Sequence, residues 1–128
     1  MKQRIQPKSL SDPRPRYSQA ILTQPGKLLF IAGQTAQDSN GNLVGKGDIE
    51  AQTRQALENI KVILTEAGGS FADIVSTTTY VVDSKHREGL NRVRRTYFEK
   101  DPPTSTFLVI KGLAHEDYLV EISAIAVL

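Results

Sequence analysis

One acidic residue interrupts the most apolar stretch of this 128-residue chain. Glu121 lies in the run 119–128, whose other members are apolar or small. Burying an ionised carboxylate without partners is expensive, so a carboxylate in such a run is usually paired, linked to water or used in chemistry. An exposed position near the start of a strand explains the residue equally well. The pattern alone therefore leaves a catalytic role and a surface role open for Glu121.

Three other residues have the chemistry to line a ligand site. Tyr17 follows a proline-rich segment, Gly33 lies where a predicted strand ends, and Asn91 falls on a predicted helix. A phenol or an amide can hydrogen-bond a ligand, and a glycine allows close approach. Each residue also has an ordinary explanation, because Tyr17 can pack, Asn91 can lie at the surface and Gly33 can adopt a positive φ.

Several kinds of site find no support in the sequence. The chain has no cysteine, which excludes disulfides, thiolate nucleophiles and Cys-based metal sites. His86 and His115 lack a second ligand at metal-binding spacing, so we expect both to be solvated surface residues. No glycine motif of the nucleotide-binding kind is present. We expect neither a metal nor a cofactor.

The charge balance bears on the partners of the protein. Sixteen Lys and Arg against fourteen Asp and Glu give a net charge of +2, which is too small to indicate a nucleic-acid partner. Arg92, Arg94 and Arg95 could form a cationic patch for RNA, but a helix spreads them around its circumference and no aromatic platform is interleaved. We expect these arginines to form a solvated helix face.

No targeting or membrane segment is recognisable. Residues 1–7 are basic, but no apolar stretch follows them, so they predict neither a signal peptide nor an anchor. No window approaches the ~18 apolar residues that a membrane span needs. A cytoplasmic protein without a membrane partner is expected.

The elements that must position the candidate residues follow from turn signals and hydrophobic periodicity. Strands are predicted over residues 20–23, 28–31, 74–82, 105–111 and 118–128, and helices over residues 49–67 and 85–99. Pro25-Gly26 suits a type II turn, which predicts that the first two strands form a hairpin. Asp48 is the expected N-cap of the first helix, and Gly68-Gly69 supplies its C-terminal stop.

These elements predict one α+β domain. The length suits a single core, and 39% hydrophobic with 23% charged residues is typical of globular proteins. Prolines 7, 13 and 15 make residues 1–15 an extended lead-in, and residues 16–128 form the domain. The order ββαβαββ predicts a two-layer sandwich in which both helices cover one face of a mixed sheet.

The last strand predicts an oligomer. Over residues 118–128, both alternating sets of side chains are largely apolar. Helices can cover only one face of the sheet, so the other face should be buried against further subunits or form an exposed patch.

The combined pattern resembles the RidA family (YjgF/YER057c/UK114-like) over residues 16–128. The resemblance rests on the order and spacing of Ala32-Gly33-Gln34, the helix from Asp48 to Gly69, Asp73-Ile74-Val75, Asn91, Pro102-Pro103 and Leu119-Val120-Glu121-Ile122-Ser123-Ala124-Ile125-Ala126. It implies a chorismate-mutase-like fold and a homotrimer with three small-molecule clefts between subunits.

The resemblance also implies a chemistry. Archetypal members hydrolyse reactive enamines and imines released by pyridoxal-phosphate enzymes, giving a 2-oxo acid and ammonia without a cofactor. By motif position, Glu121 matches the glutamate that holds the attacking water. Further cleft-lining positions fall on Tyr17, Gly33, Asn91, Ser105, Thr106 and Phe107.

One family residue is missing. Members with the catalytic signature carry a carboxylate-binding arginine where this chain has Ser105, and Phe107 occupies a position that is often small or cysteine. Serine cannot form the bidentate fork of arginine, in which each charge-assisted bond is worth ~1.5–3 kcal/mol. The chain thus resembles the arginine-lacking branches. Whether Arg14, Arg16 or another cation replaces the clamp stays open.

Three functions follow from the resemblance. The first is a trimeric, cofactor-free imine deaminase acting on an atypical small carboxylate or related metabolite. The second is a non-catalytic metabolite-binding or regulatory protein, and the third is an endoribonuclease or translation inhibitor. Ser105 favours the second over archetypal deamination, and the weak net charge disfavours the third.

Overall fold

Four strands form the main sheet, in the spatial order β3–β6–β4–β5. The computed structural model describes residues 2–128. The strands are β3 (Leu28–Gln34), β4 (Ile74–Val81), β5 (Thr104–Val109) and β6 (Val120–Val127). Pairs β3–β6 and β6–β4 are antiparallel and pair β4–β5 is parallel, so the sheet is mixed, as predicted.

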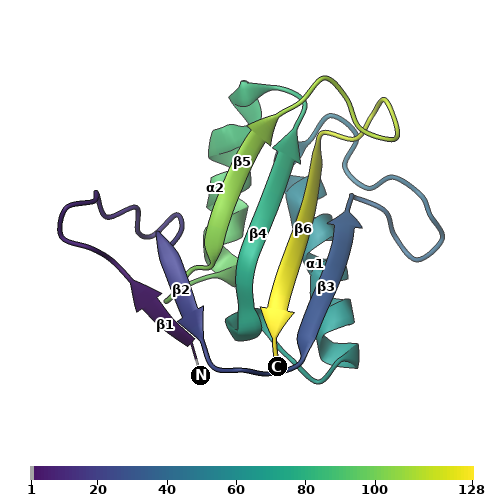
Figure 1. Cartoon of the computed structure of the whole chain (residues 1–128). Coiled ribbons are helices and arrows are strands. Elements are labelled where there is room, and N and C mark those ends of the chain that lie inside the picture. The colour runs from purple at the N-terminus through teal and green to yellow at the C-terminus, as the bar shows by residue number, and fades with distance from the viewer. Residues whose placement is uncertain (1) are drawn as a thin grey trace.

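Two helices cover one face of this sheet (Figure 1). They are α1 (Ile49–Glu66) and α2 (Arg87–Tyr97). Two short 3₁₀ turns, η1 (Phe71–Asp73) and η2 (Ser84–His86), precede β4 and α2 respectively. The predicted limits of α1 are confirmed, because the Asp48 side chain accepts a hydrogen bond from the Ala51 amide and Gly68 adopts a φ of +83° beyond the helix end. None of the helices within residues 2–128 has the length and apolar content needed to span a bilayer.

The two faces of β6 have different surroundings. Its even-numbered side chains are buried in the core under the helices: Val120, Ile122, Ala124 and Ala126. The odd-numbered side chains from Glu121 to Val127 are only half-buried on the opposite face. On the neighbouring strand, Leu28 and Phe30 are exposed. The predicted α+β sandwich is confirmed, and its helix-free face carries apolar side chains, such as Leu28 and Phe30, that none of residues 2–128 covers.

The predicted hairpin is wrong. Strand β2 (Ala20–Thr23) pairs with an N-terminal strand that the sequence analysis did not identify, β1 (Lys2–Ile5), and the resulting ribbon lies on the β5 side of the sheet (Figure 1). A type II turn needs a glycine with positive φ, whereas Gly26 does not have one. Gly26 instead allows close contact with the chain end, because a Cβ there would lie 2.5 Å from the Leu128 carbonyl oxygen. Residues 24–27 therefore form no tight turn, and they lead from β2 past the C-terminal end of β6 to the start of β3.

Candidate functional site

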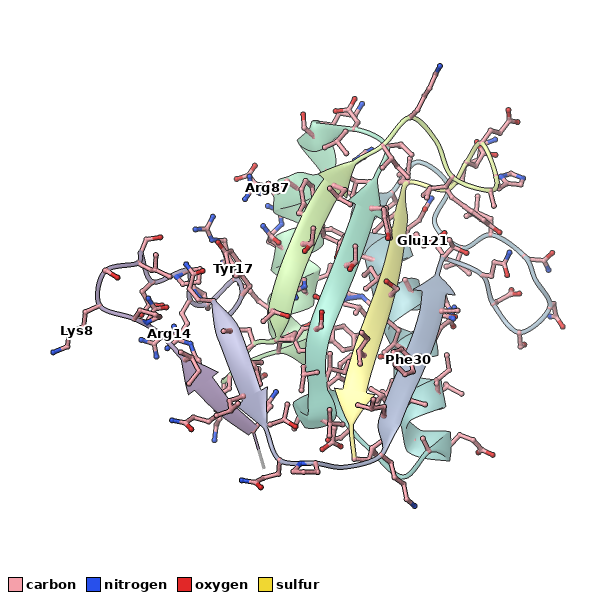
Figure 2. The ribbon with its side chains drawn as sticks, viewed as in Figure 1. Lys8, Arg14, Tyr17, Phe30, Arg87 and Glu121 are labelled. Atoms are coloured by element: carbon pink, nitrogen blue, oxygen red, sulfur yellow. The ribbon has the colours of Figure 1, made fainter. Side chains whose placement is uncertain are left out.

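A cavity of about 200 Å³ lies beside the edge strand β5, bounded by α2 and by the segment that precedes β2. Four of the residues predicted to bind a ligand line it: Tyr17, Asn91, Ser105 and Phe107. In Figure 2, Tyr17 lies beyond the β5 edge on the same side as Arg87. The structure thus brings together residues from three separate segments of the chain.

The register of β5 explains which of its side chains reach the cavity. Ser105 pairs with Thr77 and Phe107 with Thr79, both of which are buried on the helix-covered side. Because successive residues of a strand point to opposite faces, Thr106 lies on the other face, where it is exposed. Of the three predicted β5 residues, Ser105 and Phe107 therefore border the cavity and Thr106 does not.

Tyr17 is held beside β5 by its neighbour Ser18. The Ser18 amide donates to the Pro103 carbonyl at 3.0 Å, and its hydroxyl donates to the Pro102 carbonyl at 2.5 Å. Ser18 is fully buried, so both bonds are shielded from water. They fix the segment before β2 against the start of β5 and so form one wall of the cavity.

The expectation that Arg94 lies on a solvated helix face is wrong. Its side chain is only 5% exposed, and its guanidinium donates to the Arg16 carbonyl at 2.5 Å and to the Thr77 hydroxyl at 2.8 Å. The Phe98 ring lies 4.9 Å from the guanidinium carbon, which adds a cation–π contact. Burial lowers the pKa of Arg94 to about 10. The group remains a cation at neutral pH.

Arg16 and Arg87 complete a set of three guanidinium groups that border the cavity. Arg87 is exposed and lies over the Phe107 ring, 5.4 Å from its centre. No acidic residue lines the cavity. The ion pairs among residues 2–128 involve other cations, namely Arg4, Arg14, Lys46 and Arg92. The cavity is therefore electropositive. Of the two arginines that the sequence left open as clamps, Arg16 lines the cavity and Arg14 pairs with Asp12, whereas Arg87 was not predicted.

Glu121 lies away from this cavity. It pairs with Tyr80 in the β4–β6 register and alternates with core residues, which places it on the helix-free face. Figure 2 shows Glu121 on β6, distant from Tyr17 and Arg87. Gly33 is its neighbour, because a Cβ on Gly33 would lie 2.6 Å from the Glu121 carboxyl carbon. The chain thus presents two groups of predicted site residues on opposite faces of the sheet.

His86 also differs from its prediction, because it is buried rather than solvated. It is the last residue of η2 and the N-cap of α2. Burial, followed by the nearby Lys85 charge, lowers the pKa of His86. Within residues 2–128, no three His, Cys, Asp or Glu side chains gather in a group suited to a metal ion.

The fold and the site define a class: a two-layer α+β protein with an electropositive, ligand-sized cavity beside the edge strand of its sheet. Residues 8–128 match the family model described as Endoribonuclease L-PSP. A RutC family protein of Pyrococcus horikoshii is 41% identical over 126 residues, which cover 98% of each chain. The chain therefore belongs to the Rid (YjgF, endoribonuclease L-PSP) family.

Solved structures of this family share the fold. A Rid family protein of unknown function from Yersinia pestis, YyfB, is 36% identical, with a TM-score of 0.92 over 99% of this chain and 98% of that one. RidA from an Antarctic Psychrobacter is 29% identical, with a TM-score of 0.74 over 98% of this chain and 99% of that one. The resemblance stated from the sequence is confirmed at the level of family and fold.

Proposed function

We propose that this protein is a cytoplasmic homotrimer that binds a small metabolite in clefts between subunits and hydrolyses an enamine or imine there without a cofactor. One observation carries the proposal. Glu121 and the cavity lined by Tyr17, Asn91 and Ser105 lie on opposite faces of the sheet in one chain. They can act together only if the helix-free face of one subunit meets the β5 edge of another.

The helix-free face supports this assembly. Phe30 is 69% exposed and Leu28 is 61% exposed on β3, beside the half-buried Ile125 and Val127 of β6. Exposing this apolar surface to water is unfavourable, so the face is better suited to contact with another subunit. A closed ring of identical contacts buries it in every subunit at once, as cyclic symmetry requires. Three subunits would form three equivalent clefts.

The chemistry needs one carboxylate and several neutral hydrogen-bonding groups. The Glu121 carboxylate of one subunit accepts a proton from water while the water oxygen forms a bond to the imine carbon. The electron pair of the C=N bond moves to nitrogen, which takes up that proton from Glu121, and a carbinolamine forms. The hydroxyl proton of the carbinolamine then passes through Glu121 to the nitrogen, and the C–N bond breaks as the C=O bond forms, which releases ammonia and a carbonyl product. General-base catalysis of this kind contributes roughly 10²–10⁴-fold in rate. Tyr17, Asn91 and Ser105 would orient the substrate.

A second candidate is a binding protein without catalysis, because Ser105 stands in place of the family's carboxylate-binding arginine. Ammonia release distinguishes the two. Imines generated in situ from several amino acids are supplied to wild type and to Glu121→Gln, and ammonia is measured above the spontaneous rate. Deamination predicts accelerated release from at least one imine that the variant loses. Equal rates of ammonia release with and without wild-type protein would support the second candidate, a binding protein without catalysis.

A further inference from the structure

Two buried polar atoms without partners lie in residues that line the same cavity. Within residues 2–128, three buried side-chain atoms lack a hydrogen-bond partner, and two of them are Oγ1 of Thr79 and Nε of Arg94. Thr79 is 1% exposed and Arg94 is 5% exposed. Leaving a buried polar group unpaired is costly, and a ligand that enters the cavity would offer partners to both atoms.

Arg94 has spare donors as well as an unpaired charge. A guanidinium carries five N–H donors, and the contacts to Arg16 and Thr77 use two of them. No carboxylate lies within ion-pair distance of Arg94 among the described residues. A buried cation without an anion is unfavourable, and an anion that enters the cavity would offset that cost.

The spacing along α2 places a second cation beside the first. Residues 87, 91 and 94 follow the i, i+4, i+7 spacing of one helix stripe, and all three line the cavity. Arg87 lies over the Phe107 ring at the outer end of this stripe. The neutral side chain of Asn91 separates the two guanidinium groups. One helix face thus presents two cations and an amide to the cavity.

We propose that Arg94 and Arg87 of α2, together with Thr79, bind an anionic oxygen group of the ligand, either a carboxylate or a phosphate. The inference rests on the proposed function only in taking this cavity as the ligand-binding part of the cleft, and it requires no turnover. Guanidinium groups suit planar or tetrahedral oxyanions because their donors form a fixed fork. The helix would then supply the clamp that Ser105 cannot supply.

Calorimetric titration of the full-length protein with malonate, inorganic phosphate and neutral malonamide tests this. We expect malonate or phosphate to bind in a salt-sensitive manner and malonamide not to bind. Arg94→Gln should weaken anion binding about tenfold to a hundredfold, as loss of a charge-assisted bond predicts. Arg87→Gln should weaken it about twofold to fivefold, because that side chain is exposed. Arg92→Gln, on the same helix but outside the cavity, should leave it unchanged.

Two further variants distinguish the loss of an anion contact in Arg94→Gln from a loss of folded structure. Arg94→Lys keeps the charge and should retain part of the affinity, and Thr79→Val should weaken binding while keeping the shape of the side chain. Absence of anion binding to wild type, or equal binding by wild type and Arg87→Gln, would overturn the clamp. Anion binding without ammonia release would refute the deaminase and leave the clamp intact. Phosphate binding alone would identify a phosphorylated ligand, and malonate binding alone a carboxylate.

Discussion

Glu121 and Ser105 lie on opposite faces of the same four-stranded sheet. Ser105 is in register with the buried Thr77 on the helix-covered side, whereas Glu121 alternates with the core residues of β6 and faces away from the helices. A single chain therefore holds the two parts of the expected site apart. The proposed function therefore requires assembly of several chains, and this requirement can be tested.

A charge on the helix-free face should prevent assembly. Phe30→Asp places a carboxylate on the exposed apolar surface, where burial against another subunit would leave it unpaired. Sedimentation should give about three times the 14.1 kDa chain mass for wild type and the single-chain mass for the variant. Ammonia release should be lost with the trimer.

Val62→Asp is the matched control for assembly. Val62 is 68% exposed, nearly equal to the 69% of Phe30, but it lies on α1, which covers the other face of the sheet. This variant should sediment like wild type. A monomeric wild type, or a trimeric Phe30→Asp variant, would refute the proposed interface.

The missing β5 arginine should limit deamination of simple 2-imino acids. A clamp from Arg87 and Arg94 would hold the carboxylate beside α2 and not at the position of Ser105 on β5, so wild type should release little ammonia from 2-iminopropionate. Ser105→Arg adds a bidentate partner for the carboxylate on β5, but it also adds a fourth cation to the cavity. The double variant Ser105→Arg/Arg87→Gln keeps the number of cations unchanged, and its turnover should exceed that of wild type about tenfold or more.

Two controls accompany this comparison. Ser105→Lys in the same background supplies a point charge without the planar fork and should give a smaller gain. Adding Glu121→Ala should return the rate to the spontaneous one. Rapid turnover of 2-iminopropionate by wild type would show that Ser105 is not limiting and that the α2 arginines suffice.

Gly26 should be essential for the path between the ribbon and the sheet. A Cβ at this position would lie 2.5 Å from the Leu128 carbonyl oxygen and 2.9 Å from Cγ1 of Val127. The next residue, Lys27, exchanges two backbone hydrogen bonds of 2.9 Å with Leu128, so the backbone has little room to shift. Gly26→Ala should lower the free energy of unfolding by about 1–3 kcal/mol.

Gly112→Ala provides the comparison for Gly26. A Cβ at Gly112 meets nothing within 4 Å, and its φ is not positive. This substitution should leave the free energy of unfolding unchanged or raise it by up to about 1 kcal/mol, because it restricts the unfolded chain. Urea denaturation at fixed protein concentration measures both effects. Equal stability of the two variants would contradict the role assigned to Gly26.

Local signals predicted most of the fold. Asp48 and Gly68 marked the ends of α1 because caps depend on neighbouring residues. The alternation in β6 predicted two largely apolar faces but did not show which one the helices cover. The failure at Gly26 has a non-local cause. Its close contact is with Leu128 at the other end of the chain, and no local pattern reveals whether a glycine serves a turn or a close approach.

The candidate site was predictable to a similar degree. Tyr17, Asn91 and Ser105 do border one cavity, but the sequence did not show that Glu121 lies on the other face. Arg94 was missed because arginine is usually exposed, although its i+4 spacing from the buried Leu90 already placed it on the inner stripe of α2. The hydrogen bonds that make its burial tolerable come from distant segments, which a local pattern cannot reveal.

Burial of His86 should make stability depend on pH below about 6.5, the ordinary pKa of histidine. Burial and the Lys85 charge lower the pKa of His86 in the folded chain, so between the two pKa values the unfolded chain binds more protons. The free energy of unfolding should therefore fall as the pH decreases from 6.5 towards the folded-state pKa, and this contribution should level off below it.

His86→Gln should remove this part of the slope, and Lys85→Gln should reduce it because the second cause of the shift is lost. Urea denaturation between pH 7.5 and pH 5, at one protein concentration so that assembly is constant, measures the slope for all three proteins. A His86→Gln variant that loses stability with acid as steeply as wild type would show that another group is responsible.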